Sequence, residues 1–349
     1  MYGYLEALRE AGIGARVEPF LGEAAFRRFY APGVGGLLWK AGGAALGYAR
    51  RAVLLAAPGR PDLAFIHREA VPRGNRAVLA RLGGLGIPVV YDLDDAIYLR
   101  PRDFVREGED SRRLMHRGKD PSEVDDLLAG SDLALVGNGT LAAHAREVGA
   151  RRVEVLPTPV DTDLFRPGAA PEGADPRPLV GWIGSPTATY CLRGIASALS
   201  KAAAQVPFRL LVVGASGPVE VPGVEVIRRD WSLDRESSDY ASLAVGLYPL
   251  PDSPWTRGKC GYKALLYAAS GVPCVASPVG VSAEIVRDGE TGFHARTDEE
   301  WADRIPRLLR DPALRARMGA AGRRRVEEGY SVRALAPCLV SALRSVVNP

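Results

Sequence analysis

Two lysines four residues apart are the first candidates for chemistry in this chain. Only five of its 45 basic residues are lysine, and two of those five are Lys259 and Lys263. Four residues are about one helical turn, so both ammonium groups are expected on one face at the start of a helix over 259–269. Helix N-termini carry partial positive charge and free N–H groups. Two cations there favour a bound anion, most often phosphate. The alternative is a pair of solvated lysines on a surface helix.

The residues that follow predict a second wall for such a site. The run GVPCVASPVG at 271–280 reads as a tight turn, a short buried strand and a loop rich in proline and glycine. Ligands of α/β proteins bind where parallel strands end at their carboxyl edge. We therefore expect the loop over 277–281 to face the same crevice as the lysines.

Three carboxylates, Asp92, Asp94 and Asp95, follow a predicted strand over 87–92. Carboxylates this close repel one another, so some of their pKa values should rise unless cations intervene. Two interpretations stay open: a group that binds a substrate hydroxyl or handles protons, or a structural cluster paired with arginine. The candidate arginine partners are Arg68, Arg100 and Arg102.

His67 ends another predicted strand, over 62–67, and precedes Arg68. It is a candidate for orienting or contacting a substrate. The alternative is a hydrogen-bonded structural histidine, because the chemistry of this side chain depends on its partners.

The elements that must position these residues alternate between strand and helix. This alternation predicts an α/β fold with parallel sheets covered on both faces. Predicted helices cover 2–11, 76–85, 121–128, 140–147, 190–205, 299–309, 312–328 and 331–347. Predicted strands cover 62–67, 87–92, 132–136, 153–156, 179–183, 208–213, 224–227 and 243–247, with a further strand at Cys274.

Proline divides the chain into two halves. Six prolines lie between 157 and 178, which is typical of a linker. The sequence thus predicts two doubly wound Rossmann-like domains that face a central cleft. Their expected bounds are 1–160 for an acceptor-side domain, 161–178 for the linker, 179–330 for a donor-side domain, and 331–349 for a helix that packs back on the first domain. The first domain opens with a helix where a strand is usual.

Composition limits the functional classes. The 349 residues are 47% hydrophobic and 25% charged, with net charge +4, which suits anionic small molecules and an ordinary globular fold. Basic patches interleaved with aromatic residues are absent, so nucleic acid is not an expected partner. Four cysteines without paired spacing favour a reduced, cytoplasmic protein without a metal centre. No signal peptide or transmembrane segment is expected. Residues 33–57 form an apolar stretch that either covers a sheet or makes peripheral contact with a membrane.

Several motifs resemble the retaining GT-B glycosyltransferases of group 1, family 4. The most specific is KCGYKALLYAASGVPCVASPVG at 259–280, followed by AEIVRDGETGF at 283–293. GWIGS at 181–185, LPTPVD at 156–161 and YDLDDAIY at 91–98 extend the resemblance to about two thirds of the chain.

The resemblance implies transfer of a sugar from a nucleotide-diphosphate sugar to an acceptor hydroxyl, without metal or other cofactor. Lys259 and Lys263 would hold the diphosphate, where fixed cations stabilise the charge that develops as the sugar–phosphate bond breaks. With the lysines, the catalytic candidates are His67, Asp94 and Asp95. The other donor-binding candidates are Gly184, Ser185, Thr187, Val279, Gly280, Val281 and Glu284.

One departure from the family concerns its two glutamates spaced eight apart, the second of which anchors the ribose. Gly258 and Leu266 occupy these positions here. Glu284 either supplies a replacement contact or caps the helix that follows it.

Three other functions are alternatives to glycosyl transfer. A sugar-nucleotide epimerase has the same architecture, and a non-catalytic sugar-nucleotide-binding homologue would explain the missing glutamates. A dehydrogenase is disfavoured, because no Gly-x-Gly-x-x-Gly motif follows a strand with an acidic residue about twenty positions on.

Overall fold

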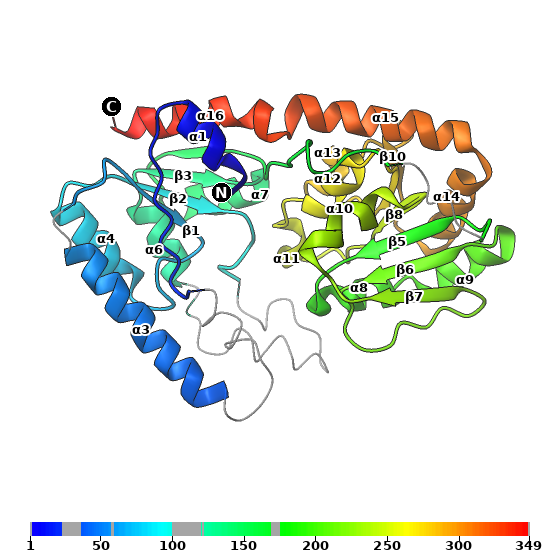
Figure 1. The fold of residues 1–349 in the computed structure, drawn as a ribbon, viewed down its shortest axis with the longest axis horizontal. Coiled ribbons are helices and arrows are strands. Elements are labelled where there is room, and N and C mark those ends of the chain that lie inside the picture. Colours follow the sequence, from blue (N-terminus) through cyan, green and yellow to red (C-terminus); the bar gives the residue numbers. More distant parts are fainter. Residues whose placement is uncertain are drawn as a thin grey trace.

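The computed structural model describes residues 2–22, 36–56, 59–99, 120, 122–168 and 175–347. Two lobes lie side by side, each built on a parallel sheet (Figure 1). The N-lobe comprises the described residues up to 156 together with 332–347, and the C-lobe comprises those from 160 to 331. The inner strands of the two sheets are short and mostly apolar, as buried parallel strands require, whereas the edge strands over 153–155 and 225–229 are partly exposed.

The N-lobe sheet has four parallel strands in the order β1-β2-β3-β4. They are β1 (Ala64–His67), β2 (Val89–Leu93), β3 (Leu133–Val136) and β4 (Val153–Val155). Side chains alternate between the two faces of a strand, and Val89 and Val90 accordingly enter different hydrophobic clusters. The helices of this lobe are α1 (Leu5–Glu10), α3 (Gly36–Ala56), α4 (Asn75–Gly84), α6 (Ser122–Gly130), α7 (Gly139–Glu147) and α16 (Val332–Val347), and a 3-10 turn, η1 (Tyr2–Tyr4), precedes them.

The C-lobe sheet has six parallel strands in the order β10-β9-β8-β5-β6-β7. Its strands are β5 (Leu179–Ile183), β6 (Arg209–Val213), β7 (Glu225–Arg229), β8 (Val245–Tyr248), β9 (Cys274–Ala276) and β10 (Gly292–His294). Its helices are α8 (Thr189–Arg193), α9 (Ala196–Gln205), α10 (Leu233–Ala241), α11 (Pro254–Arg257), α12 (Tyr262–Ala269), α13 (Ser282–Ile285), α14 (Asp298–Arg310) and α15 (Pro312–Gly329), with a 3-10 turn, η3 (Pro186–Ala188), after β5.

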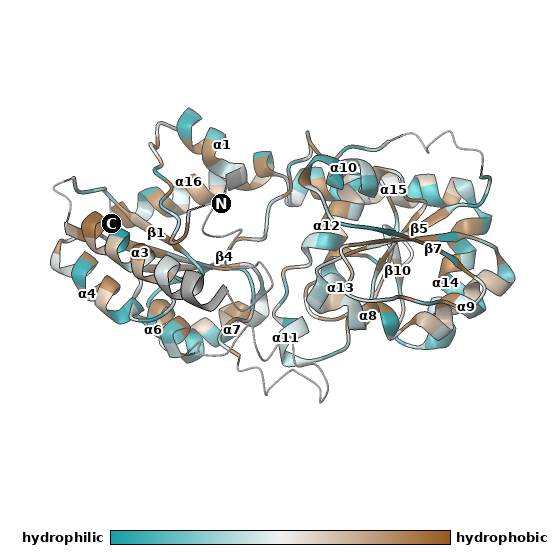
Figure 2. Ribbon diagram, turned by 60° about the horizontal axis from the view of Figure 1, so that its bottom comes forward, coloured by the Kyte–Doolittle hydropathy of each residue, from teal (hydrophilic) through white to brown (hydrophobic). Residues whose placement is uncertain are grey.

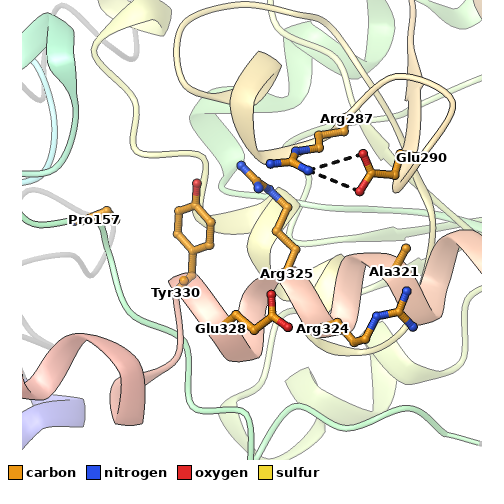
Figure 3. Close-up of a pocket in the computed structure, with 9 residues that line it drawn as sticks. Pro157, Arg287, Glu290, Ala321, Arg324, Arg325, Glu328 and Tyr330 are labelled. Carbon is orange, nitrogen blue, oxygen red and sulfur yellow. Dashed lines mark hydrogen bonds and ion pairs between the residues drawn. The ribbon is translucent and has the colours of Figure 1, made fainter.

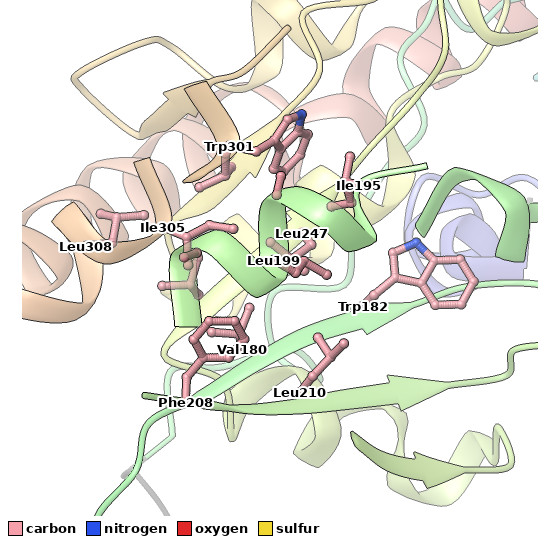
Figure 4. Packing of buried hydrophobic residues seen from close by; sticks show 14 of the residues in the cluster. Val180, Trp182, Ile195, Leu199, Phe208, Leu210, Leu247, Trp301, Ile305 and Leu308 are labelled. Atoms are coloured by element: carbon pink, nitrogen blue, oxygen red, sulfur yellow. The ribbon is translucent and has the colours of Figure 1, made fainter. Parts of the chain in front are cut away.

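Both faces of the C-lobe sheet are buried. Trp182, Leu199 and Trp301 belong to the cluster between the sheet and helices α9 and α14, shown in Figure 4. Val213 and Tyr267 belong to the opposite cluster, under α12. The covering helices carry hydrophobic and hydrophilic residues together, as expected when one side faces a sheet and the other faces solvent (Figure 2). The C-lobe is therefore doubly wound.

The chain crosses between the lobes twice at one place. Val160 donates its N–H to Tyr330 O and accepts from Val332 N, at 2.8 and 3.0 Å. After this crossing, α16 runs across the N-lobe beside α1 (Figure 1). Leu335 and Leu339 pack there against Leu133 and Leu135 of β3.

Some predicted elements differ from the structure. The helix predicted over 190–205 is two helices, because Ile195 between them has a non-helical backbone beside Gly194. Glycine costs a helix about 1 kcal/mol relative to alanine, which favours a break there. Helices α10, α11 and α13 and strand β10 had no clear periodic signal. Arg100 and Arg102, the other candidate partners of the carboxylates, lie outside the described residues.

Candidate functional site

Lys259 and Lys263 approach the boundary between the lobes from different local structures. Helix α11 ends at Arg257, with Gly258 as its C-cap, and α12 begins at Tyr262. Lys259 therefore lies in the turn between two helices, and only Lys263 lies on α12. The expectation that both lysines open one helix is wrong, because Gly261 has φ +67°, a left-handed conformation that interrupts an α-helix.

Lys263 lies deep at the edge of the C-lobe sheet. Its Nζ is 5.0 Å from the ring centroid of Trp182, a favourable distance for a cation–π contact. A Cβ on Gly184 would lie 2.8 Å from the same Nζ, so the glycine lets the ammonium reach the end of β5. Burial, together with the charge of Lys259, lowers the pKa of Lys263 to about 8. A bound anion would relieve both effects.

Lys259 contacts the other lobe. Its Nζ is 3.4 Å from Oδ2 of Asp95 and 4.9 Å from the ring centroid of Trp255. The charge of Lys259 is felt by Lys263, while its carboxylate partner belongs to the N-lobe. Lys259 thus links the donor-side cations to the carboxylates of the opposite lobe.

The loop after β9 rests on the lysine turn. A Cβ on Gly280 would lie 2.6 Å from Arg257 O, and one on Gly261 would lie 3.3 Å from Cγ1 of Val281. The N–H of Val279 is bonded within the loop, to Ser277 O at 2.8 Å and to Ser282 Oγ at 3.0 Å. The predicted neighbourhood of lysines and loop is therefore present in the fold.

Ser185 and Thr187 occupy the turn after β5. Their hydroxyl oxygens lie 3.1 Å apart. Gly184, just before them, donates its N–H to Val213 O at 3.0 Å, which ties the ends of β5 and β6 together. These residues share the carboxyl edge of the sheet with Lys263.

Each N-lobe carboxylate has a different cationic or histidine partner. Asp92 Oδ2 lies 2.7 Å from His67 Nδ1, and Asp95 is paired with Lys259. Asp94 accepts two bonds from Arg68, at 2.6 and 3.0 Å. Burial alone would raise the pKa of Asp94, but the hydrogen bonds and charge of Arg68 outweigh it and lower the pKa. The expected mutual repulsion is thus offset pair by pair.

Arg68 has an unusual backbone for its residue type. Its φ is +62°, and among the described residues it is the sole non-glycine with positive φ. The Tyr91 hydroxyl donates to Arg68 O at 2.8 Å, and the bidentate pair with Asp94 fixes the side chain. Strained conformations of this kind cost about 1–3 kcal/mol and are concentrated at functional sites.

Comparison with known proteins finds a family that part of the chain matches. Residues 177–311 match the family described as "Glycosyl transferases group 1". The D-inositol 3-phosphate glycosyltransferase of Rhodococcus jostii (strain RHA1) is 26% identical over 236 residues, which cover 63% of this chain and 47% of that protein. The chain thus spans about half the length of the curated relatives it matches.

Solved structures give the fold. Sucrose-phosphate synthase from Thermosynechococcus elongatus is similar with a TM-score of 0.65 at 21% identity, over 86% of this chain and 77% of that one. Anabaena HepE in complex with UDP-glucose has a TM-score of 0.64 at 16% identity, over 86% and 84%. Residues 177–311 are thus similar to glycosyltransferase group 1, and the chain has the GT-B fold.

The structure explains why this chain lacks the two glutamates of the family it resembles. A Cβ on Gly258 would lie 2.5 Å from Cβ of Ala96 in the N-lobe, so no side chain fits. Leu266 is buried in the hydrophobic cluster under α12. A carboxylate at Leu266 would need a partner inside that apolar cluster.

Glu284 lies exposed inside α13, and no side chain caps that helix. The expectation that Glu284 caps the helix is therefore wrong. Its carbonyl oxygen accepts a bond from Arg325, at 2.7 Å.

Two further residues near this site carry no prediction from the sequence. Trp231 follows β7, is 51% exposed, and has its Cβ 3.5 Å from where a Cβ on Gly214 would lie. Gly214 in turn approaches Gly184 O, so Trp231 lies at the same sheet edge as Lys263. An exposed tryptophan in a polar segment was the available signal. Asn138, after β3, had no such signal.

A groove of about 440 Å³ lies next to Glu284, whose carbonyl oxygen accepts from Arg325 in the groove lining. It is lined by Arg287, Arg324, Arg325 and Tyr330, beside the interlobe segment at Pro157 (Figure 3). Arg287 is paired there with Glu290. None of the candidate site residues lines this groove.

The described residues also bear on metal binding and on membrane-spanning helices. No group of three or more His, Cys, Asp and Glu side chains in that part of the chain is arranged to hold a metal ion. Nor does any helix there have both the length and the apolarity needed to cross a bilayer.

Proposed function

We propose that this protein transfers a sugar from a nucleotide-diphosphate sugar to an acceptor hydroxyl, with retention of anomeric configuration. The observation that carries the proposal is the pair of lysines at the lobe boundary, of which Lys263 is partly buried beside a second cation, at a cost that an anion would offset. The diphosphate of the donor is such an anion. The match of residues 177–311 to glycosyltransferase group 1 supports the same reaction class.

The proposed reaction places the negative charge next to the lysines. The bond between the sugar's anomeric carbon and the phosphate oxygen breaks, and the electron pair stays on the diphosphate. Cations already fixed in place stabilise that charge without reorganising. The acceptor oxygen bonds to the same face of the anomeric carbon, and its proton passes to the leaving phosphate oxygen.

Retention without a protein nucleophile is supported by the N-lobe carboxylates. Asp92, Asp94 and Asp95 are each engaged with His67, Arg68 or Lys259. A carboxylate held in an ion pair is a weak nucleophile. We propose that His67 orients the acceptor or the donor sugar, and that Asp94 and Asp95 keep Arg68 and Lys259 in place.

The donor subsite we propose extends along the C-lobe sheet edge. Gly184, Ser185 and Thr187 would face the sugar diphosphate, together with the loop of Val279, Gly280 and Val281. Trp231 offers an exposed aromatic face on which a nucleobase could stack. HepE is solved with UDP-glucose, so UDP-sugars are the first donors to test.

A peripheral contact with membrane is part of the proposal. Leu46 and Val53 of α3 are 68% and 71% exposed and lie seven residues apart, on one face of the helix. The helix has Lys40, Arg50 and Arg51 but no acidic residue. It lies on the side of the N-lobe away from the C-lobe (Figure 1). An apolar stripe beside basic residues suits an anionic bilayer and a lipid-linked acceptor. The four cysteines, all of them described and none in a disulfide, support a cytoplasmic location.

A donor panel tests the proposed function. UDP-, GDP- and dTDP-sugars are compared by thermal shift, where the true donor should stabilise the protein by mass action. Slow hydrolysis of that donor without acceptor, and a product of unchanged anomeric configuration by NMR, would support the proposal. Interconversion of free sugar nucleotides would show an epimerase, and binding without either reaction a non-catalytic homologue.

A further inference from the structure

Asn138 lies where the N-lobe meets the turn that carries Lys259. It is buried at 4% exposure and is the N-cap of α7, where its side-chain oxygen accepts from Leu141 N at 3.0 Å. Its side-chain nitrogen donates across the lobe boundary to Gly258 O at 3.0 Å and Lys259 O at 3.2 Å. One side chain therefore fixes a helix start in one lobe and the lysine turn of the other.

The surfaces around Asn138 fit without spare room. A Cβ on Gly137 would lie 2.1 Å from Cys260 Sγ, and one on Gly258 would lie 2.5 Å from Cβ of Ala96. The Cys260 thiol donates to Asp94 O at 3.0 Å, within the N-lobe hydrophobic cluster. Cys260, which follows Lys259 directly, is thus packed into the N-lobe.

We propose that Asn138 is a positioning residue that holds the Lys259 turn on the N-lobe and so sets the ammonium of Lys259 at the proposed diphosphate site. This inference rests on the proposed function. Asn138 acts through Lys259 and touches no donor atom itself. The amide of Asn138 is suited to this role, because its oxygen caps helix α7 while its nitrogen donates to the carbonyls of Gly258 and Lys259.

Separation of the lobes has a definite cost at this place. The carbonyls of Gly258 and Lys259 would lose the Asn138 donor, and the apolar surround of Cys260 would open to water. Each hydrogen bond of this kind shifts an equilibrium about two- to tenfold. Together, the two hydrogen bonds from Asn138 are therefore strong enough to favour one position of Lys259.

Asn138→Asp is the sharpest substitution. Aspartate caps a helix as well as asparagine, so α7 keeps its start, but the donor becomes an acceptor that faces two carbonyls. We expect kcat/KM for the donor to fall about tenfold or more. Asn138→Ser keeps a capping oxygen and removes the donor without adding charge, and should act in the same direction.

Gly258→Ala tests the same contact from the other lobe. Gly258 has φ −78°, which alanine adopts freely, so the added methyl group acts only as a wedge against Ala96. We expect the same loss of kcat/KM as for Asn138→Asp.

Cysteine labelling supplies a readout independent of turnover. Cys260 is 8% exposed, and Cys191 and Cys274 are buried within the C-lobe, while Cys338 is exposed. Labelling with N-ethylmaleimide, resolved by peptide mass spectrometry, should be at least about tenfold faster at Cys260 in Asn138→Asp and Gly258→Ala. Cys191 and Cys274 should keep their rates, which shows that the C-lobe stays folded.

The outcomes separate this inference from the proposed function. Unchanged Cys260 labelling or unchanged kcat/KM in both Asn138→Asp and Gly258→Ala overturns the positioning role. Equally faster labelling of Cys191, Cys260 and Cys274 in Asn138→Asp would indicate that this variant unfolds, and Gly258→Ala then decides. If Gly258→Ala unfolds as well, the result counts against the proposal. A wild-type protein without donor turnover refutes the proposed function, while faster Cys260 labelling in the variants would still show the interlobe contact.

Discussion

Lys263 carries its charge where charge is unfavourable. The ammonium lies over Trp182 at the end of β5, and burial lowers its pKa to about 8. A lysine kept in such a place is poised for an anion, because the anion restores the charged form.

Donor affinity should therefore depend on pH. The charged form of Lys263 binds the diphosphate, and in the free protein it is lost as pH rises through about 8. We expect Kd for the donor, measured by titration calorimetry from pH 6.5 to 9.5, to rise above pH 8. A constant Kd up to pH 9.5 would contradict the role of Lys263.

The lowered pKa of Lys263 affects folding stability in the opposite direction: donor affinity falls above pH 8, whereas stability rises. Lysine in the unfolded chain keeps its proton up to its ordinary pKa of 10.5, whereas folded Lys263 releases its proton near pH 8. The unfolded state then binds more protons in this window, so the contribution of Lys263 to the free energy of unfolding rises between pH 8 and about 10.5. Comparison of denaturant midpoints for wild type and Lys263→Met across that window checks the sign.

Removal of the charge should cost activity. We expect Lys263→Ala to lower kcat by about 10²- to 10³-fold, since groups that stabilise developing negative charge have effects of this size. Lys201→Ala is the matched control, because Lys201 is an exposed lysine of α9 paired only with Glu299 in the described structure. Equal losses in the two variants would refute the site.

The loop after β9 is held by a serine. Ser282 at the start of α13 is buried, and its Oγ bonds Ser277 O at 2.6 Å and Val279 O at 2.6 Å. These bonds fix the loop of Val279, Gly280 and Val281 against the lysine turn.

Ser282→Ala should lower the free energy of unfolding by about 1–3 kcal/mol, because buried loop carbonyls lose their donor. It should also weaken donor binding. Ser270→Ala is a matched control: Ser270 is equally buried, and its Oγ has no hydrogen-bond partner in the described part of the chain. That variant should be neutral or more stable in chemical denaturation. A Ser270→Ala loss as large as that of Ser282→Ala would contradict the argument.

Elements whose signal is local were predictable from the sequence. The strands at 64–67, 89–93 and 179–183 are apolar runs, and α14 has the expected amphipathic spacing. Helix α10 was missed because its sequence, LDRESSDYA, is mostly polar. The lysine helix was placed one turn too early because Gly261 reads as an ordinary glycine until its backbone is seen.

The site was predictable only in part, for a related reason. Lys259 and Lys263 are marked by residue type and spacing in a single segment. Their partners come from elsewhere: Asp95 lies 164 residues from Lys259, and Asn138 lies 120 residues from Gly258. Contacts between lobes leave no local pattern in one sequence.

At the scale of the molecule, α3 has an apolar face that the described residues leave uncovered. It packs beside α4 at one edge of the N-lobe, and its exposed face carries Leu46 and Val53. Exposed apolar stripes of this kind are uncommon on proteins that stay free in solution.

Leu46→Asp should therefore reduce cosedimentation with vesicles of phosphatidylglycerol and phosphatidylcholine, since a charge replaces an apolar contact beside basic residues. Leu233→Asp in α10 is the matched control, because Leu233 is also 68% exposed but lies on the C-lobe. Binding that is equal for wild type and Leu46→Asp, or absent for both, would refute the membrane contact.

Helix α16 has a consequence for biosynthesis. It follows the whole C-lobe in the chain, yet Leu335 and Leu339 cover the face of the N-lobe sheet that Leu133 and Leu135 present. On the ribosome, that apolar face is made roughly two hundred residues before its cover. The C-lobe can complete its own fold first, while the nascent N-lobe offers a hydrophobic surface to chaperones until the last helix emerges.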